Sequence, residues 1–588
     1  MVDLQEDQAL IGVPWRPWTG EAFRLAHERD VPILLSISAV WCHWCHVMDE
    51  TTYRNPEIIR RLATEVVPIR VDADQRPDLN NRYNLGGWPS TAFLTPDGDL
   101  LTGGTFMPEE ELLGTLDQVT SYYRDRREEL ESKVQRRRAR RARISELRHR
   151  LRGNVTPEII DTVVEAVLKA YDPRYGGFGD APKFPLPDTI ELALAMGYAN
   201  RDEALLDVAG STLTAMAQGG MYDHLAGGFF RYSTTADWSE PHYEKMLEGN
   251  ARLLDVYLQA AQVFDAPQYW ETARGIVAWA EATLRQPETG AFGGSSQADE
   301  EYYHLDARER AERNPPRVDE TLYTDWNAMM ISALLRAACL LDEPYYGDLA
   351  LEVLEAIWDR NYLPGSGMAH FYDGSPHLPG LLGDQVWMGR ALLDAQAYVG
   401  AGNYLERAET ILDIMRARLL DPDAGGFYDI PYDPAALGRL QDRHKLLDLN
   451  SLAADLALSL GRLTGREEHE ELAVDALEAM APLYGPYRHH AAAYGLAVYR
   501  FVHSPLHLII VGDPLARLSR SLRLAALSIY DPNRLVESVD PVRSMARLEQ
   551  LGLPVRPAPA LYIRRRKQTS PAIEDPAQVR AAAQAMPA

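Results

Sequence analysis

The chain has 588 residues, 46% of them hydrophobic and 25% charged, and its length favours more than one domain because single cores rarely exceed about 250–300 residues. Sixty basic and 85 acidic side chains give a net charge of −25, which disfavours nucleic acid as a partner, since that binding depends on neutralising phosphates. The sequence contains no run of 18 apolar residues, so it predicts no membrane span. The N-terminus lacks the basic region and the apolar region of a signal peptide. We therefore expect a cytoplasmic protein with no membrane partner.

Strands and helices alternate over the first 125 residues. Apolar, β-branched runs at 31–41 and 67–74 predict two buried strands, and residues 90–107 predict two more around a Pro-Asp-Gly turn. Apolar residues with the spacing of a helix follow each of the first two runs and occur again at 108–124. This alternation predicts an α/β sheet.

The segment WCHWC begins where the first strand gives way to a helix. Cys42 would lie at the exposed helix N-terminus, where amides and the helix dipole favour a thiolate, with Cys45 one turn away and behind it. A redox pair, a metal site with His43 and His46, and a c-type haem attachment site all fit the motif. Haem attachment needs export, and adjacent histidines do not easily converge on one ion. The pattern favours thiol–disulfide exchange with no metal and no other cofactor, and Cys339 is expected in the core.

Together with GGWPSTAFLTPDG, this segment resembles thioredoxin, and WCHWCHVM followed by GGWP resembles the N-terminal domain of the spermatogenesis-associated thioredoxin-domain proteins. The resemblance implies that Cys42 attacks a disulfide, that Cys45 resolves the mixed disulfide, and that Pro89 is a cis proline shaping the substrate groove. Trp41 and Trp44 are expected to take part in binding. Thioredoxin has Gly-Pro between its cysteines where this chain has His-Trp, so reductant and isomerase both stay open.

From residue 156 to about residue 502 the pattern changes to twelve amphipathic segments of helical period. Glycine-aromatic signals such as YGGFGD, GGFFRY and GGFYDI separate them at intervals of about two helices. Six helix pairs with a glycine-rich turn at the same end of each pair favour a closed (α/α)6 ring around a central funnel. An open superhelix of stacked hairpins is the alternative.

Polar and aromatic residues gather between residues 219 and 250 and at the starts of later helices, including His444 and Asn450. Any one of them alone is more often a cap or a satisfied polar contact. If they share one mouth, crowded carboxylates there would resist ionisation. The acid–base candidates are Asp223, His224, His242, Glu244, Asp325 and Asp384. The candidates for ligand binding are Arg231, Tyr232, Trp238, Tyr243 and Trp326.

The second region also resembles the spermatogenesis-associated group, through YGGFGDAPKFP, GGMYDHLAGGFFRYS and PHYEKM. In that group it looks like the six-hairpin glycosidases and the N-acylglucosamine 2-epimerases, which implies a sugar or glycan ligand. This chain departs from the group at Gly383-Asp384, where Glu-Asp is expected, and at residues 448–451, where Ser-Gly-Asn-Ser is usual.

The expected organisation is a thioredoxin-like domain (1–125), a charged helical linker (126–154), a six-hairpin barrel (155–503) and a small α/β domain (504–588). The basic block in the linker is read as a solvated helix rather than a phosphate-binding one. We expect a thiol–disulfide oxidoreductase with a redox partner protein and a sugar-binding barrel. The alternatives are a sugar epimerase, isomerase or glycoside hydrolase with a regulatory thioredoxin-like domain, and a non-catalytic scaffold.

Overall fold

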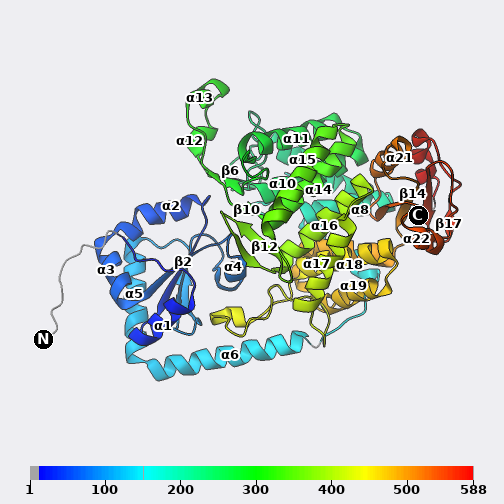
Figure 1. Cartoon of the computed structure of the whole chain (residues 1–588). Helices are drawn as coiled ribbons and strands as arrows, with labels where there is room; N and C mark the ends of the chain where they lie inside the picture. Colours follow the sequence, from blue (N-terminus) through cyan, green and yellow to red (C-terminus); the bar gives the residue numbers. More distant parts are fainter. Residues whose placement is uncertain (1–11, 150, 587–588) are drawn as a thin grey trace. The chain divides into compact units, whose positions relative to one another are not determined.

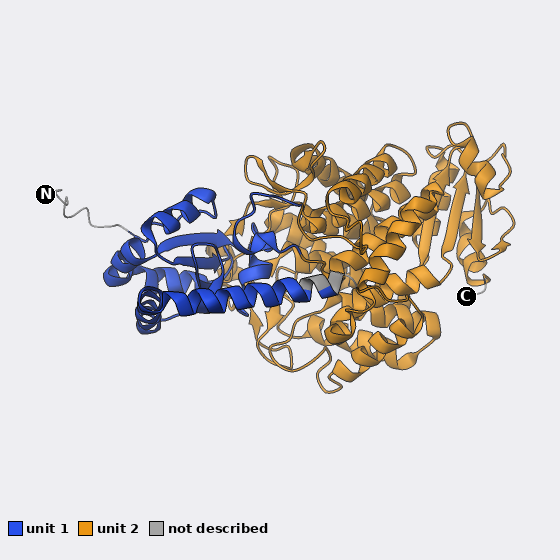
Figure 2. Cartoon of the chain, turned by 90° about the horizontal axis from the view of Figure 1, so that it is seen from below, with its two compact units in different colours: residues 1–149, 432–443 blue, residues 150–431, 444–588 orange. Residues whose placement is uncertain are grey.

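The structure is a computed structural model that describes residues 12–149 and 151–586. The chain divides into two compact units (Figure 2). Unit 1 comprises residues up to 149 together with 432–443, and unit 2 comprises 150–431 and 444–588. Across the described ranges no helix has both the length and the apolarity needed to cross a membrane.

Unit 1 contains a four-stranded sheet in the order β2-β1-β3-β4. The strands are β1 (Ile33–Ser38), β2 (Val67–Asp72), β3 (Ser90–Leu94) and β4 (Leu100–Gly104). β1 pairs in parallel with β2 and antiparallel with β3, which in turn pairs antiparallel with β4. All four expected strands are confirmed, and the alternation of strands and helices sets them in an α/β sheet.

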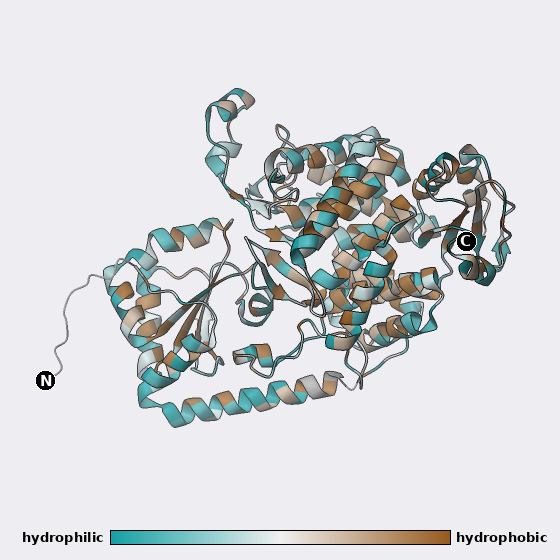
Figure 3. Cartoon of the chain, in the orientation of Figure 1, coloured by the Kyte–Doolittle hydropathy of each residue, from teal (hydrophilic) through white to brown (hydrophobic). Residues whose placement is uncertain are grey.

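Six helices complete unit 1 (Figure 1). They are α1 (Gly20–Arg29), α2 (His43–Glu50), α3 (Pro56–Glu65), α4 (Pro77–Tyr83), α5 (Glu109–Asp125) and α6 (Arg127–His149). Asn55 caps α3, with Pro56 at its first position. α6 carries the basic block and is mainly hydrophilic along its length (Figure 3). Two of its arginines, Arg138 and Arg141, form ion pairs with Asp99 in the turn between β3 and β4.

Unit 2 contains a ring of six inner helices, each packed against the next, with α20 closing the ring against α8. The inner helices are α8 (Pro187–Asn200), α10 (Leu247–Phe264), α14 (Thr324–Leu340), α16 (Leu382–Val399), α18 (Leu447–Thr464) and α20 (Ala492–Val502). The outer helices are α7 (Glu158–Ala170), α9 (Glu203–Gln218), α11 (Pro267–Trp279), α15 (Pro344–Asn361), α17 (Tyr404–Arg418) and α19 (Glu467–Met480). The closed (α/α)6 ring is confirmed.

Short strands and two small helices connect the pairs before the inner helices. They are β5 (Tyr232–Ser233), β6 (Pro241–His242), β7 (Lys245–Met246), β8 (Ser295–Ser296), α12 (Glu300–Tyr303), α13 (Ala307–Glu312), β9 (Val318–Asp319), β10 (Leu322–Tyr323), β11 (Tyr362–Leu363), β12 (Gly367–Tyr372) and β13 (Pro376–Pro379). These connections and the first turns of the inner helices hold the polar residues that the sequence singles out.

One amide side chain fastens each of four inner helices to the glycine-aromatic turn before it. Asn327 on α14 accepts a hydrogen bond from the Phe292 N–H (3.0 Å) and donates to the Phe292 and Tyr323 carbonyls (2.9 Å each). The same three bonds are made by Asn250, Gln385 and Asn450. This repeated bond satisfies buried backbone groups and aligns the starts of the inner helices.

Residues 504–586 form a second α/β sheet whose order, β15-β14-β16-β17, matches that of unit 1. β14 pairs in parallel with β15 and antiparallel with β16, which pairs antiparallel with β17. The elements are β14 (Leu506–Val511), α21 (Arg517–Leu527), β15 (Arg534–Val539), α22 (Met545–Leu551), β16 (Ala560–Arg565), β17 (Gln568–Thr569) and α23 (Val579–Gln584). A proline, Pro559, directly precedes β16 as Pro89 precedes β3, but this sheet has no cysteine.

Candidate functional site

Cys42 and Cys45 lie at the start of α2 and are not joined in a disulfide. Cys42 is the N-cap residue, and its Sγ accepts a hydrogen bond from the Cys45 N–H at 3.2 Å. The pKa of Cys45 is lowered, first by its hydrogen bond with Cys42 and then by Ser38 and the backbone of Ala39, against the opposing effect of burial. The two thiols therefore titrate as a pair, and one proton leaves more readily than it would from an isolated cysteine.

The two thiols are almost equally buried, since Cys42 is 4% exposed and Cys45 is 2% exposed. The expected difference in exposure is therefore absent, and exposure alone does not decide which thiol attacks. His43 and His46 do not join the two cysteines in a group of metal ligands anywhere in the described ranges. The geometry favours the redox interpretation of the motif.

The sheet positions Pro89 beside the C-terminal end of β1, and the chain continues from this end of the strand to Cys42. Ile37 pairs with Ser90, so the residue before Ser90 lies beside the last residue of β1. The Trp88–Pro89 peptide bond is cis, as expected. The indole of Trp88 packs edge-on against Trp41 at 5.6 Å.

The two tryptophans of the motif have different environments. Trp41 is buried and donates from its indole N–H to Asp74 at 2.6 Å, which ties the segment before Cys42 to the residues after β2. Trp44 is 50% exposed and packs edge-on against Phe106 at 5.3 Å. Trp44 is therefore the better candidate for contact with a substrate.

In unit 2, Asp223 lies in a glycine-rich turn and is buried. Its carboxylate accepts hydrogen bonds from Lys245 at 2.7 Å and from Arg310 at 2.9 and 3.0 Å. Burial opposes its ionisation, but Lys245 and Arg310 outweigh that effect and lower its pKa. Equivalent turns hold the pairs Asp172–Lys183 and Asp421–Lys445. The repetition favours a structural role for Asp223 over the expected acid–base role.

His224 lies in the same turn and is exposed. Its Nε2 lies 3.2 Å from the Gly219 carbonyl oxygen, and its ring packs edge-on against Tyr222. No carboxylate is a hydrogen-bond partner of His224 among the described residues, so no group holds its ring for proton transfer.

His242 and Glu244 form a hydrogen-bonded pair just before α10. Nδ1 of His242 contacts a carboxylate oxygen of Glu244, which is fully buried and also bonds Arg231 at 3.2 Å. The ring of Tyr232 stacks on the imidazole of His242 with 5.0 Å between the ring centroids. The ring of Phe184 in turn stacks on Tyr232 at 4.9 Å. These contacts fix the orientation of the imidazole.

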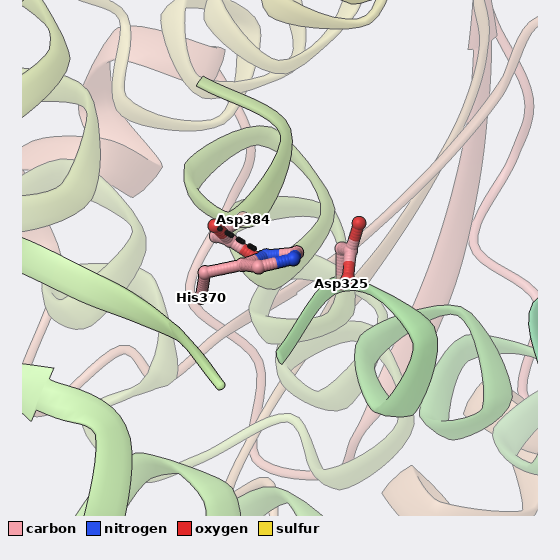
Figure 4. Close-up of side chains that lie close together, drawn as sticks. All are labelled: Asp325, His370 and Asp384. Atoms are coloured by element: carbon pink, nitrogen blue, oxygen red, sulfur yellow. Dashed lines mark hydrogen bonds and ion pairs between the residues drawn. The ribbon is translucent and has the colours of Figure 1, made fainter. Parts of the chain in front are cut away.

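Asp325 and Asp384 lie in the first turns of α14 and α16, and His370 lies in β12. Nδ1 of His370 is 3.0 and 3.2 Å from the two Asp384 carboxylate oxygens. Figure 4 shows the ring of His370 between the two carboxylates, and one donor atom from each of the three side chains lies within 4.8 Å of the others. The Trp326 N–H donates to Asp325 Oδ1 at 3.0 Å.

Burial raises the pKa of Asp325 to about 7, the charge of Asp384 adds to that effect, and His370 opposes it. The pKa of Asp384 is raised as well, first by burial and against the opposing charge of His370. Resistance to ionisation is the expected behaviour of crowded carboxylates.

Acidic side chains recur at the starts of the inner helices. Asp188, Glu248, Asp325 and Asp448 lie in the first turns of α8, α10, α14 and α18. Burial raises the pKa of Glu248, while the charges of Arg231 and Arg252 lower it and those of Asp188 and Asp448 raise it further. Gly383 takes the corresponding position on α16, so the series of acids is interrupted there. At this position the chain also departs from the protein group that it resembles.

Three expected aromatic binding residues have partners inside the fold. Trp238 is fully buried and donates to the carbonyl of Tyr175 at 3.1 Å. Trp326 is buried against Tyr323, and Tyr243 is half-buried with its hydroxyl 3.0 Å from His304. These contacts leave Tyr232 as the aromatic candidate that lies directly against an acid–base residue.

The inner ring also encloses a polar cavity of about 160 Å³ toward the C-terminal ends of its helices. Its charged lining consists of Glu191, Arg336, Arg390, Asp394, Asp455, Arg462, Arg500, Asp531 and Arg534. Residues 529–535, ahead of β15, line it together with side chains of all six inner helices. The arginines there pair with acids, as in Arg500–Asp455 at 2.5 Å, and they face helix ends that favour positive charge.

Sequence reasoning missed His370, although it lies within the glycine-aromatic signal GMAHFYD. Alternation along β12 places it on one face with Met368 and Tyr372. Glu248 and Asp448 were also missed as candidates. Their common signal is an acid two residues before the amide that fastens an inner helix.

Comparison with known proteins agrees with this architecture. Residues 5–140 match the family model Thioredox_DsbH, described as "Protein of unknown function, DUF255". The molecule is thus a thioredoxin-like domain joined to an (α/α)6 barrel. Its resemblance to the spermatogenesis-associated thioredoxin-domain proteins is confirmed by the relatives that it matches.

Spermatogenesis-associated protein 20 of Homo sapiens is 34% identical over 307 residues, which cover 49% of this chain and 39% of the relative. The match thus spans about two fifths of that relative's length. An uncharacterised protein of Caenorhabditis elegans is 24% identical over 634 residues, covering 87% of this chain and 86% of the relative.

Solved structures similar to the barrel include the cellobiose 2-epimerase of Spirochaeta thermophila, with 16% identity and a TM-score of 0.48 over 58% of this chain and 94% of that one. A D-mannose isomerase has 14% identity and a TM-score of 0.47 over 59% and 98% of the two chains. The assignment of the ring rests on its own helix contacts and not on these matches.

Proposed function

We propose that the protein is a thiol–disulfide oxidoreductase that acts through Cys42 and Cys45. The observation that carries the proposal is the hydrogen bond from the Cys45 N–H to Cys42 Sγ at the start of α2. A sulfur held by a helix N-terminal amide is stabilised as the thiolate, the form that attacks disulfides. We propose the cytoplasm as its compartment, because thiol pairs are kept reduced there.

The reaction conserves two electrons and two protons. The Cys42 thiolate attacks one sulfur of a substrate disulfide, which forms a mixed disulfide and expels the other substrate sulfur as a thiolate. Cys45, once deprotonated, attacks Cys42 Sγ and releases the second substrate thiolate. The protein dithiol is oxidised and the substrate disulfide is reduced. A dithiol donor, such as a reduced partner protein, then regenerates the free thiols.

The test is reduction of insulin disulfides by the full-length chain with dithiothreitol as donor, followed as turbidity. The wild type is expected to accelerate the reaction, and Cys42→Ser and Cys45→Ser to lose that acceleration. Cys339→Ser is the matched control, because this thiol lies in unit 2, and it should keep full activity. Equal rates for the wild type and Cys42→Ser would contradict the proposal.

A second candidate is acid–base chemistry on a polyhydroxylated ligand, such as a sugar, at the starts of the inner helices. The observation that favours it is the His242–Glu244 pair with Tyr232 stacked on the imidazole. A carboxylate that holds Nδ1–H leaves the lone pair of Nε2 as a general base. Aromatic rings beside such a base suit the apolar faces of sugar rings.

This candidate is tested by exchange of a sugar carbon-bound proton in deuterated water, measured by NMR across a panel of aldoses and disaccharides. Exchange by the wild type should fall at least about 100-fold in His242→Asn, the size of effect expected for loss of a general base. His377→Asn is the control, because His377 is an exposed histidine bonded to Asp373. Absence of exchange with every sugar argues against this candidate and leaves the thiol chemistry untouched.

A further inference from the structure

Asp325, His370 and Asp384 bring two carboxylates and one imidazole together from three separate elements. Their donor atoms lie within 4.8 Å of one another. His370 is 3% exposed and Asp384 is 1% exposed, whereas Asp325 is half-buried. Residues 325, 370 and 384 are far apart in sequence, so the cluster exists only in the folded barrel (Figure 4).

The charge of this cluster is not balanced as it is at other buried acids of unit 2. Asp172, Asp223 and Asp421 each bind a lysine ammonium. Within the described ranges, the one basic side chain in ion-pair distance of Asp384 is His370, and Asp325 has none. With a neutral imidazole the cluster carries two negative charges, and buried unpaired charge is costly. A bound cation would remove this cost.

The donor set is one that divalent metal ions prefer. Carboxylate oxygen and imidazole nitrogen suit ions of the Mn²⁺, Fe²⁺ and Zn²⁺ class. Donors bound to one zinc ion at about 2.0–2.2 Å lie about 3.3–3.5 Å apart in a tetrahedral site, so side-chain shifts of about 1 Å bring this cluster to that spacing. Three protein donors leave further coordination positions of such an ion for water.

The surrounding charges favour the same kind of ligand. Glu248 lies close enough to Asp325 to raise its pKa, and Glu248 and Asp448 lie in the first turns of α10 and α18. Acidic side chains that gather at one place attract cations. By contrast, the polar cavity of about 160 Å³ is lined by arginines as well as acids and offers no such preference.

We propose that Asp325, His370 and Asp384 bind one divalent cation of the Mn²⁺, Fe²⁺ or Zn²⁺ class in the barrel. Asp325 and Asp384 supply carboxylate oxygens and His370 supplies an imidazole nitrogen. This site goes beyond the proposed thiol chemistry and does not depend on it, since it lies in the other unit. The competing interpretation is a proton shared among the same three side chains.

The experiment is calorimetric titration of the full-length, EDTA-treated protein with ZnCl₂ and, separately, with MnCl₂. One ion per chain is expected, and Co²⁺ should give visible absorption bands when it occupies the same site. Asp325→Asn and His370→Gln should each weaken binding at least 100-fold. Asp325 is half-buried, so its variant is expected to fold even if the buried His370 variant does not, which circular dichroism checks.

His377→Gln is the matched control, because His377 bonds the carboxylate of Asp373 in the turn before β13, but its side chain is 43% exposed outside the cluster. The proposed site is supported if His377→Gln retains metal binding and Asp325→Asn loses it. No uptake by the wild type at millimolar metal overturns the proposal in favour of the shared proton. Uptake that Asp325→Asn leaves unchanged overturns it as well, because the ion then lies elsewhere. Neither result bears on insulin reduction.

Discussion

At the scale of single residues, Cys42 and Cys45 differ more in hydrogen bonding than in exposure. The sulfur of Cys42 accepts a helix N-terminal amide, and the Cys45 thiol bonds to Cys42 and lies near Ser38. One proton shared between the two sulfurs satisfies the bond between the thiols, and the amide of Cys45 favours a negative charge on Cys42. We assign the attacking role to Cys42 because of this amide and not because of access.

Iodoacetamide at about pH 7 should therefore modify Cys42 well ahead of Cys45 and Cys339 in the reduced protein. Burial raises the pKa of Cys339 to about 11, which keeps that thiol protonated and slow to react. Peptide mass spectrometry after brief labelling measures the order. If Cys45 were labelled before Cys42, the attacking role would belong to Cys45.

Asp421 illustrates an acid whose role is structural. Burial opposes its ionisation, but hydrogen bonds from Lys445, Tyr428 and the turn backbone outweigh burial and lower its pKa to about 2. An acid with a lowered pKa in the folded state stabilises the fold above its unfolded-state pKa. That contribution, about 2 kcal/mol, is lost as the pH falls from about 4 toward 2.

Asp421→Asn should lower the free energy of unfolding at neutral pH by about 3 kcal/mol, because it removes the carboxylate that pairs with the Lys445 ammonium. The variant should also lose part of the acid dependence between about pH 4 and 2. Urea denaturation at several pH values measures both effects. Asp423→Asn is the control in the same turn, since Asp423 is exposed, and a loss of equal size there would refute the argument.

The local signals of the sequence located the cysteines and the helix starts but not the partners of each side chain. Asp223 looks like a catalytic acid in sequence because its partners Lys245 and Arg310 lie 22 and 87 residues away. His370 was overlooked because it lies in a short strand rather than at a helix start. Both outcomes depend on tertiary contacts that periodicity does not encode.

At the scale of elements, one amide side chain fastens each of four inner helices to the segment that precedes it. Each of Asn250, Asn327, Gln385 and Asn450 binds the backbone of the preceding glycine-aromatic turn. The helices themselves were predictable from their 3.6-residue period and from the signals between them. The partner of each amide was not, because it lies 17 to 35 residues back in an irregular turn.

Asn327→Ala should destabilise the barrel by about 3 kcal/mol, because it leaves the buried N–H and C=O of Phe292 without partners. Thermal unfolding followed by circular dichroism measures this loss. Asn403→Ala is the control, since Asn403 is an exposed asparagine next to α17 whose side chain makes no capping bond. Equal melting temperatures for the two variants would mean that the amide does not hold the ring.

At the scale of the whole molecule, unit 1 is completed by a segment that follows it by almost three hundred residues. Residues 432–443 leave the barrel sequence and pack into unit 1. Arg82 donates to the Asp442 carbonyl at 2.6 Å, and the Arg439 N–H donates to the Tyr83 hydroxyl at 2.8 Å. No periodic pattern marks this segment, and from the sequence it is therefore expected in the barrel region, whereas in the folded chain it belongs to unit 1.

Gly438 is the tightest point of that segment. A methyl group there would lie 2.6 Å from the Tyr83 hydroxyl oxygen and 3.1 Å from the Trp18 ring, and the backbone φ of +57° is one that L side chains rarely adopt. The Cα of Gly98, in the turn between β3 and β4, would lie 3.3 Å from the same methyl group. The glycine is required by both space and conformation.

Gly438→Ala should therefore loosen the segment from unit 1 at a cost of about 2–3 kcal/mol, the backbone strain accounting for about 1 kcal/mol of it. Hydrogen exchange should rise at α4 and near Gly98, while the inner helices of unit 2 keep their protection. Gly365→Ala is the matched control, because Gly365 has a φ of +77° but nothing within 4 Å of the added methyl, so it carries the strain alone. If both variants exchange alike at α4, packing of residues 432–443 does not stabilise unit 1.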